Sequence, residues 1–432
     1  MNQFSLYKFT SVALITLAIL SYFFGFYLDE SSTGAGGHTG DFEHIYANLE
    51  FFLKHDLVTS ISNPNYHDSR PPTPYILHEA LNPFAEDKIN FRRSVFFISL
   101  LIPILFYFCL KQKFRNEENL LLILLSSTIF LSPYFRTSAF WGIQENYGLI
   151  FLLLTFLSTR FLNEQNNQLT YKEYIKLFTV TFLSSLCIYF DQKLIIIPAI
   201  CFFKIILSKK LIKFKIFSIF CYFIFSLPYI YLITIWGSII PSQANVSRNL
   251  GEILYLDHLG YASTMIAFYI LPLLLFKGEK LILLIKNLFL DKKNYFLIVF
   301  FFLYLIYLAL FFDFNEELLL GNGFIHKISI LIFKDYFYKS VFIYFSFFIS
   351  WLIILIYFNK NFNEYFILGY FLLLSIIIWP MFQEYFDPLI LILAFTFFNS
   401  KIYLSYKSST ILFIYLSIFL ISTNIYYLGW LN

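Results

Sequence analysis

The sequence predicts an all-α protein that crosses a membrane many times, and two observations carry this prediction. The first is composition: of 432 residues, 59% are hydrophobic and only 13% are charged. The mean hydropathy of +0.69 lies far above that of water-soluble globular proteins. The second is that apolar runs of roughly 17 to 25 residues, long enough to cross a bilayer as helices, recur along the chain. We expect one membrane domain over 1–432 and no water-soluble domain.

We expect about thirteen transmembrane helices. The first apolar run is longer than the core of a signal peptide, so it is interpreted as a retained span. The polar interval 29–93 then separates the first span from the second. The predicted spans are 9–28, 94–110, 120–134, 143–160, 174–190, 194–208, 216–236, 261–276, 295–312, 339–358, 365–380, 388–400 and 410–427.

The distribution of basic residues predicts the orientation. With the N-terminus in the cytoplasm, 20 of the 31 Lys and Arg residues fall on the inner side, as the positive-inside rule requires. The interval 29–93 is then the first extracytoplasmic loop, and all seven histidines lie on the outer side. We expect a multi-pass protein of the bacterial inner (plasma) membrane whose chemistry faces outside.

Several function classes are disfavoured by what the sequence lacks. The net charge of +4 is small and its basic residues flank apolar spans, so nucleic acid is not an expected partner. No phosphate-binding loop or dinucleotide glycine motif is present, so no nucleotide cofactor is expected. No ionisable residue lies at mid-depth of a predicted span, which disfavours ion-coupled transport.

The first outer loop begins with a predicted amphipathic helix in the stretch DFEHIYANLEFFLKH (41–55). Apolar side chains share one helical stripe and polar side chains share the opposite one, so we expect the helix to lie on the outer membrane surface. Asp41 stands where a helix N-cap is favoured, a structural role that is compatible with ligand binding. The apolar stripe comprises Phe42, Ile45, Leu49, Phe52 and Leu53, and the polar one Asp41, His44 and Asn48.

A proline-rich segment, SRPPTPYIL, follows in the same loop. Its three prolines predict an extended backbone that fixes Asp68 and Arg70 ahead of a short helix starting near Tyr75. The prolines also fit a simple crossing above the membrane, but that interpretation leaves the charged residues unexplained.

These motifs resemble the first extracytoplasmic loop of the family C (GT-C) glycosyltransferases, polytopic enzymes that transfer a sugar from a polyprenyl-phosphate carrier. The family pattern of an acidic residue, a nearby His or aromatic residue, a turn and a Pro-Pro segment is matched by Asp41, His44 and Tyr46, KHDLV and RPPTPY. The acidic position also admits Asp29-Glu30, although Asp29 directly ends the first span. A second motif, WPMFQEYFDPLILIL, is similar to a late outer motif of the family, with Gln383 in place of the more usual His.

The resemblance implies a hexosyltransferase. Its partners are a polyprenyl-phosphate-sugar donor, membrane lipid and a glycan, lipid or protein acceptor. An inverting transfer needs a general base for the acceptor hydroxyl, and Asp41 is the predicted base. The leaving phosphate needs a cation, for which Arg70, Arg136, Lys193 and Arg248 are candidates. Further predicted contacts to sugar or acceptor are Glu43, His44, His67, Asp68, Gln144, Glu145, Asp191, Gln383 and Glu384.

The metal requirement stays open at this point. The first loop offers His38, Asp41, Glu43, His44, His67, Asp68 and His78, but no His-Glu-x-x-His or paired-Cys spacing that would indicate zinc. A loosely held Mg²⁺ or Mn²⁺ neutralising the lipid phosphate is compatible with these ligand types.

Two alternatives remain beside the transferase. A polysaccharide polymerase or ligase is also polytopic, but its large outer loop usually lies in the later half of the chain. A lipid-linked-sugar flippase or another transporter would be expected to line its path with cationic groups at mid-depth, and the predicted spans carry none.

Overall fold

The computed structural model describes residues 3–31, 40–66, 68–143, 145–163, 171–208, 211–241, 254–312, 321–358 and 362–428. Over these residues the chain forms α-helices and short 3₁₀ helices (labelled η), and no β-strand occurs among them. The predicted all-α class is therefore confirmed. The chain divides into two compact units, which are described separately.

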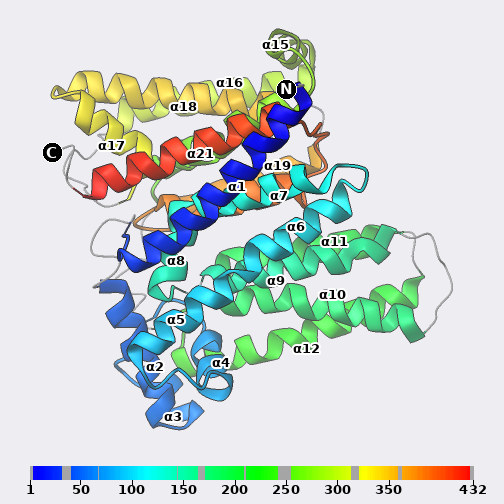
Figure 1. The fold of residues 1–432 in the computed structure, drawn as a ribbon, viewed down its shortest axis with the longest axis vertical. Helices are drawn as coiled ribbons and strands as arrows, with labels where there is room; N and C mark the ends of the chain where they lie inside the picture. The colour runs from blue at the N-terminus through cyan, green and yellow to red at the C-terminus, as the bar shows by residue number, and fades with distance from the viewer. Residues whose placement is uncertain are drawn as a thin grey trace. The chain divides into compact units, whose positions relative to one another are not determined.

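The first unit, called the loop unit, comprises Leu17–Asn116 and Pro133–Ser247. Helix α10 is its centre and packs against α9, α11 and α12, and Figure 1 shows these four helices running side by side. The unit contains the second part of α1 (Gln3–Tyr27), from Leu17 on, and the whole of α2 (Phe42–Lys54), α3 (Leu57–Ile61), α4 (Thr73–Leu81), α5 (Lys88–Ser99), α6 (Leu101–Lys113), α8 (Pro133–Trp141), α9 (Glu145–Ser158), η3 (Thr159–Asn163), α10 (Tyr171–Phe190), η4 (Gln192–Ile195), α11 (Ile196–Leu207) and α12 (Ile212–Trp236).

The second unit, called the C-terminal unit, comprises Met1–Thr16, Glu117–Ser132 and Arg248–Asn432. Helix α14 is its centre: nearly every residue is buried, and it packs against α17, α18, α19 and α20. The unit contains α7 (Asn119–Ser127), η2 (Thr128–Leu131), α14 (His258–Ile270), η5 (Leu271–Phe276), α15 (Leu281–Leu290), α16 (Lys292–Phe311), α17 (Gly323–Ile332), α18 (Tyr336–Phe358), α19 (Phe362–Ile377), η6 (Gln383–Tyr385), α20 (Leu389–Phe395) and α21 (Tyr406–Tyr427).

Within the described residues, eight helices are long and apolar enough to cross a membrane, so the protein is a multi-pass membrane protein but the predicted count of thirteen is wrong. The count becomes nine if the broken pair Asn119–Leu131 and Pro133–Trp141 forms one span. The eight are Leu6–Tyr27, Lys88–Lys113, Tyr171–Phe190, Ile212–Trp236, His258–Phe276, Asn294–Phe311, Tyr336–Phe358 and Tyr406–Tyr427.

Each of the thirteen predicted segments does contain a helix, but five of these helices, α7, α9, α11, α19 and α20, are too short to be counted as spans. The physical reason is burial. Every residue of α20 is buried within the protein, as is every residue of α8, most of which lies between the predicted spans 120–134 and 143–160. An apolar run suits a protein core as well as it suits lipid, so hydropathy alone overcounts spans.

The first loop is helical, as predicted, but its amphipathic helix packs on protein. The Phe52 ring stacks on Tyr75 of α4 with centroids 5.5 Å apart, and the Phe42 ring lies against Phe91 of α5. The Tyr46 hydroxyl donates to the Glu86 carbonyl at 2.7 Å. The apolar stripe of α2 is thus covered by α4 and α5, which corrects the expected contact with the membrane surface.

The helix caps of the loop also differ from expectation. Asp41 has a helical backbone conformation, and its side chain caps none of the α2 amides. Instead Asp56 accepts from the amides of Val58 and Thr59 at the start of α3, and Asp87 accepts from Asn90 at the start of α5. Capping therefore falls to the two aspartates with extended backbones, the conformation that lets a side chain reach back to the first turn.

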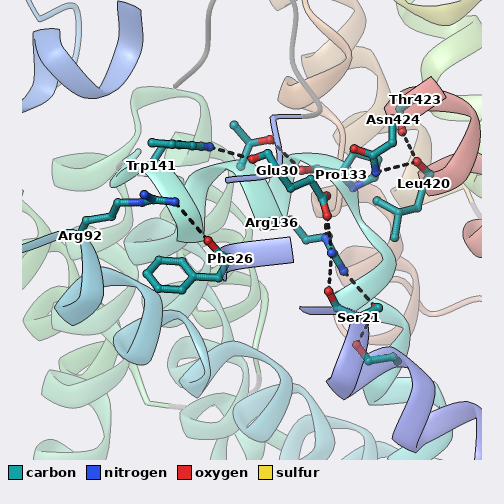
Figure 2. Close-up of polar contacts among 12 residues, drawn as sticks. Ser21, Phe26, Glu30, Arg92, Pro133, Arg136, Trp141, Leu420, Thr423 and Asn424 are labelled. Carbon is teal, nitrogen blue, oxygen red and sulfur yellow. Dashed lines mark hydrogen bonds and ion pairs between the residues drawn. The ribbon is translucent and has the colours of Figure 1, made fainter. Parts of the chain in front are cut away.

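The end of α1 is fixed by a buried arginine of α8, as Figure 2 shows. Arg136 is only 2% exposed; its Nε lies 2.8 Å from Glu30 Oε1, and its Nη2 donates to the Ser21 carbonyl at 2.7 Å. Trp141, one turn along α8, donates from its indole to the Glu30 carbonyl at 2.9 Å. We call Glu30, Ser21, Arg136 and Trp141 the α1 clamp.

A glycine makes room for the clamp. Any side chain at Gly25 would overlap Nη2 of Arg136 and Oε2 of Glu30, the two atoms that form the ion pair. A second arginine supports the same corner: Arg92 of α5 pairs with Asp29 at 2.8 Å and its guanidinium lies 3.8 Å from the Trp141 ring. Both acidic residues that follow the first span are therefore used in structure.

Replacing Arg136 by Met is expected to lower the free energy of unfolding by about 3 to 5 kcal/mol, because it leaves the Glu30 carboxylate buried without its guanidinium partner. Denaturant unfolding of the purified protein in detergent measures the change. The control is Arg93→Met, whose exposed guanidinium contacts only Asn90 at 3.3 Å among the bonds described and whose loss is expected to cost about 0.5 kcal/mol or less. Equal losses in the two variants would contradict the clamp.

Candidate functional site

Five of the predicted site residues meet in the loop unit. Asp68 and Arg70 lie at the start of the proline segment before α4, and Glu145 is the first residue of α9. Asp191 directly precedes η4, the turn between α10 and α11, and Lys193 lies within it. Three connections far apart in sequence therefore place three carboxylates and two cations together. We call these five residues the ionic cluster.

Ion pairs hold the cluster, and one of them joins Arg70 Nη1 to Asp68 Oδ1 at 3.9 Å. Arg70 Nη2 pairs with Glu145 Oε1, and Lys193 Nζ lies 3.0 Å from Asp191 Oδ2. The Gln192 amide donates to the Ser69 carbonyl at 2.7 Å and so ties the α10–α11 turn to the proline segment. The side chain of Arg70 is 23% exposed and that of Lys193 13%, so both cations remain reachable from outside the fold.

The proline segment is rigid for local reasons. Asp68 Oδ1 accepts from the Arg70 amide at 2.9 Å, and its Oδ2 accepts from the Tyr75 hydroxyl. The Tyr66 hydroxyl donates to the Arg70 carbonyl at 3.1 Å. With Pro71 and Pro72 fixing the backbone just before α4, the Arg70 side chain is pre-oriented toward α9.

The surroundings of Glu145 and Asp191 shift the pKa values of these two carboxyl groups in opposite directions. Burial tends to raise the pKa of Glu145, but the nearby Arg70 and Lys193 cations overcome it, and the net effect is a lowered pKa. Burial raises the pKa of Asp191, and the Glu145 carboxylate adds to that rise although Lys193 opposes it. The site thus combines one carboxylate held ionised with one carboxyl group inclined to take a proton.

The cluster also contains an acceptor without a donor. Glu145 Oε2 is buried and receives no hydrogen bond from the residues that the structure describes. A buried carboxylate oxygen in this state costs free energy, so a ligand hydroxyl or amide reaching it would be favoured.

Gly148 allows the cluster to assemble. A Cβ atom at this position would lie 2.6 Å from Leu194 Cδ1 and 3.5 Å from Asp191 Cβ, so η4 can approach α9 this closely only beside a glycine. Gly148 was not among the residues predicted for the site. A glycine inside a predicted helix, three residues after a candidate acid, was the available signal.

The remaining predicted residues of the loop unit lie elsewhere. Asp41 is exposed at the start of α2, Glu43 pairs with Lys88 of α5, and the carbonyl of His44 accepts from Asn48 at 2.9 Å. Arg136 belongs to the α1 clamp, so its guanidinium is already used by Glu30. His38, His67, Gln144 and Arg248 lie outside the described residues.

Gln383 and Glu384 belong to the C-terminal unit, in η6. Gln383 is 3% exposed and donates from Nε2 to the Tyr269 hydroxyl at 3.2 Å, while its Oε1 is buried without a described partner. The chain reaches this turn through Met381, whose carbonyl accepts from the Asn322 amide at 2.7 Å.

A buried histidine of the first loop was proposed only as one of several metal ligands. His78 of α4 is 6% exposed, and its ring bonds the Tyr147 hydroxyl at 2.7 Å and the Asn82 amide at 2.9 Å. Burial lowers the pKa of His78 from 6.5 to about 4. Among the described residues, no group of three or more His, Cys, Asp or Glu side chains is arranged to hold a metal ion.

Comparisons with known proteins add no assignment. No family model, no curated protein and no solved structure matches this chain.

Between pH 6.5 and 4, His78 is protonated in the unfolded chain but stays neutral in the folded chain. The free energy of unfolding is therefore expected to fall as the pH is lowered through this window. The lowered pKa corresponds to about 3 kcal/mol over the full window. Unfolding free energies measured at pH 7 and at pH 4 should differ less for His78→Gln than for the wild type. His55→Gln, at an exposed histidine after α2, should keep the wild-type difference.

Gly148→Ala is expected to destabilise the protein by about 1 to 3 kcal/mol because the new methyl group overlaps Leu194. The cost should shrink in a Leu194→Ala background, where Cδ1 is absent; unfolding of both pairs in detergent measures this coupling. Gly369→Ala is the matched control: it lies in α19 with no atom within 4 Å of the added Cβ, so it should be neutral or stabilising by up to about 1 kcal/mol. An unchanged cost in the Leu194→Ala background would argue against the overlap.

Proposed function

We propose that this protein is a membrane glycosyltransferase that moves a sugar from a polyprenyl-phosphate donor to a glycan, lipid or protein acceptor on the extracytoplasmic face. The observation that carries the proposal is the ionic cluster. Five residues singled out as site candidates gather from three connections, and they leave one buried carboxylate oxygen without a donor. A sugar hydroxyl is the kind of donor that such an oxygen accepts.

The cations of the cluster suit the leaving group. When the bond between the anomeric carbon and the phosphate oxygen breaks, the electron pair stays on that oxygen and the polyprenyl phosphate gains one negative charge. Arg70 and Lys193 lie in the cluster and are partly exposed, whereas Arg136 is committed to Glu30. We therefore assign the phosphate to Arg70 and Lys193, which stabilise the developing charge.

Two carboxyl groups compete for the role of general base. The base takes the proton of the acceptor hydroxyl as its oxygen bonds to the anomeric carbon. The resemblance favours Asp41, which is exposed at the start of α2. The ionic cluster favours Asp191, whose pKa is raised by burial and by Glu145 and which adjoins the proposed phosphate cations. Its raised pKa makes Asp191 a stronger proton acceptor than Glu145, whose pKa is lowered.

The orientation proposed for the site rests on the first two spans. Lys8 near the start of the first span and Lys111 and Lys113 at the end of the second mark one side as basic, which favours the cytoplasm. Lys8 pairs with Glu118, shortly after the second span ends, as expected of a helical hairpin whose ends lie at one level. The segment between the two spans, which contains Asp68 and Arg70, then faces outside.

The test is transfer of radiolabelled sugar from a panel of polyprenyl-phosphate donors by membranes that contain the wild type, Asp41→Asn or Asp191→Asn. Loss of the general base is expected to slow transfer by about 10²- to 10⁴-fold. The control is Asp335→Asn, an exposed aspartate that caps α18 in the other unit and should retain activity.

The outcomes separate the alternatives. A large loss in one variant alone assigns the base to that residue, provided that the variant inserts and unfolds like the wild type. Full activity of both variants would remove both residues from the role of base. No transfer by the wild type from any donor would overturn the transferase proposal and favour a flippase for the same lipid-linked sugars.

A further inference from the structure

Helix α15 of the C-terminal unit is held at a membrane boundary by its neighbours in the chain. The spanning helix His258–Phe276 precedes it and the spanning helix Asn294–Phe311 follows it, so both ends of the connection lie where a helix leaves the bilayer. The ten residues Leu281–Leu290 extend about 15 Å as a helix, half of the roughly 30 Å of hydrocarbon. The helix is therefore too short to cross the bilayer and lies beside it. Figure 1 draws α15 at the end of α16.

One face of α15 is covered by protein and the rest is not. Leu284 and Leu288 are buried, and α15 packs against α16 and α18. The other apolar side chains are exposed, up to 78% for Ile282 and 69% for Leu290. Leu281, Leu283, Ile285 and Phe289 complete this exposed apolar face.

Exposed lysines lie before, within and after α15. Residues 277–293 contain five lysines against Glu279 and Asp291, a net charge of +3. Lys280 precedes the helix, Lys286 lies within it and Lys292 follows it, and all three are exposed. Lys277 differs, because its ammonium lies 4.0 Å from the centre of the Tyr357 ring.

We propose that α15 is an interfacial helix that binds anionic phospholipid headgroups. Its exposed leucines, isoleucines and phenylalanine enter the boundary between headgroups and acyl chains, and Lys280, Lys286 and Lys292 extend to the phosphates. Long lysine stems keep the charge at the headgroup level while their methylenes stay in apolar surroundings. An apolar face with a basic border beside a spanning helix matches acidic lipid in both hydrophobicity and charge.

Lipid is favoured over a protein partner by position. The spanning helices on both sides keep α15 at the bilayer surface whatever else is present, so the membrane is always within reach of the exposed face. The proposal is independent of the proposed transferase activity, and its experiments do not use that activity.

The first experiment measures depth. A nitroxide spin label is attached at Phe289→Cys in the full chain, reconstituted into vesicles of phosphatidylcholine with a minority of phosphatidylglycerol. The four native cysteines are buried, which directs the label to the new thiol. A label in the interface should collide more with oxygen than with a water-soluble nickel complex. Ser62→Cys, an exposed polar position after α3, provides the water-exposed reference; nickel accessibility at Phe289 equal to this reference would overturn the insertion.

The second experiment measures headgroup binding. Native mass spectrometry of the detergent-solubilised chain counts retained phosphatidylglycerol and phosphatidylcholine for the wild type and for Lys280→Gln/Lys286→Gln. Each lysine near an anionic surface is worth roughly a fivefold change in affinity, so phosphatidylglycerol binding should weaken by more than about tenfold. Lys54→Gln/Lys334→Gln removes two exposed lysines elsewhere and should retain the lipid. Equal retention in the two double variants, or equal binding of the two lipids by the wild type, would overturn the proposal.

Discussion

The pairing of Arg70 with Glu145 is the interaction on which the loop unit depends. A guanidinium and a carboxylate are removed from water together only when each neutralises the other, and a partner left alone is strongly destabilising. This requirement fixes the proline segment against the start of α9. The α10–α11 turn follows, because Gln192 bonds the backbone of Ser69 and Lys193 brings its own counter-charge in Asp191. One ion pair thus sets where three separate connections meet.

Local stiffness gives that ion pair its geometry. Pro71 and Pro72 restrict the backbone after Arg70, and Tyr75 holds Asp68 from the first turn of α4. Gly148 permits η4 to approach α9, so the second ion pair lies near the first. A site assembled from helix ends and a rigid loop holds its groups in place before a ligand arrives, which lowers the cost of binding and of transition-state stabilisation.

The helices were largely predictable from the sequence, and their surroundings were not. All thirteen apolar segments contain a helix, but α20 and α9 are mostly covered by protein, and no property of an isolated apolar run distinguishes that environment from lipid. The sequence likewise does not show which charged side chains are occupied by a partner in the fold. Arg70 and Arg136 both lie in polar stretches beside apolar ones; only the fold reveals that Glu30 occupies one guanidinium in a buried clamp while the other remains partly exposed. Glu145, Asp191 and Lys193 were predicted one by one, but their convergence depends on Gly148 and Gln192, which are not ionisable and were not predicted as site residues.

Charge balance connects the ionic cluster to the donor that we propose for it. Fully ionised, the cluster has three carboxylates against two cations, and a phosphodiester adds one more negative charge. A general base must still be ionised when the donor is bound, and Arg70 and Lys193 offset the charge that the phosphodiester adds. The raised pKa of Asp191 then lets it bind the acceptor proton more readily than Glu145 does, once the reaction releases that proton. In one step the acceptor hydroxyl releases a proton and the leaving phosphate gains a negative charge. A carboxylate that binds the proton, beside two cations that bind the phosphate, therefore stabilises both within a single site.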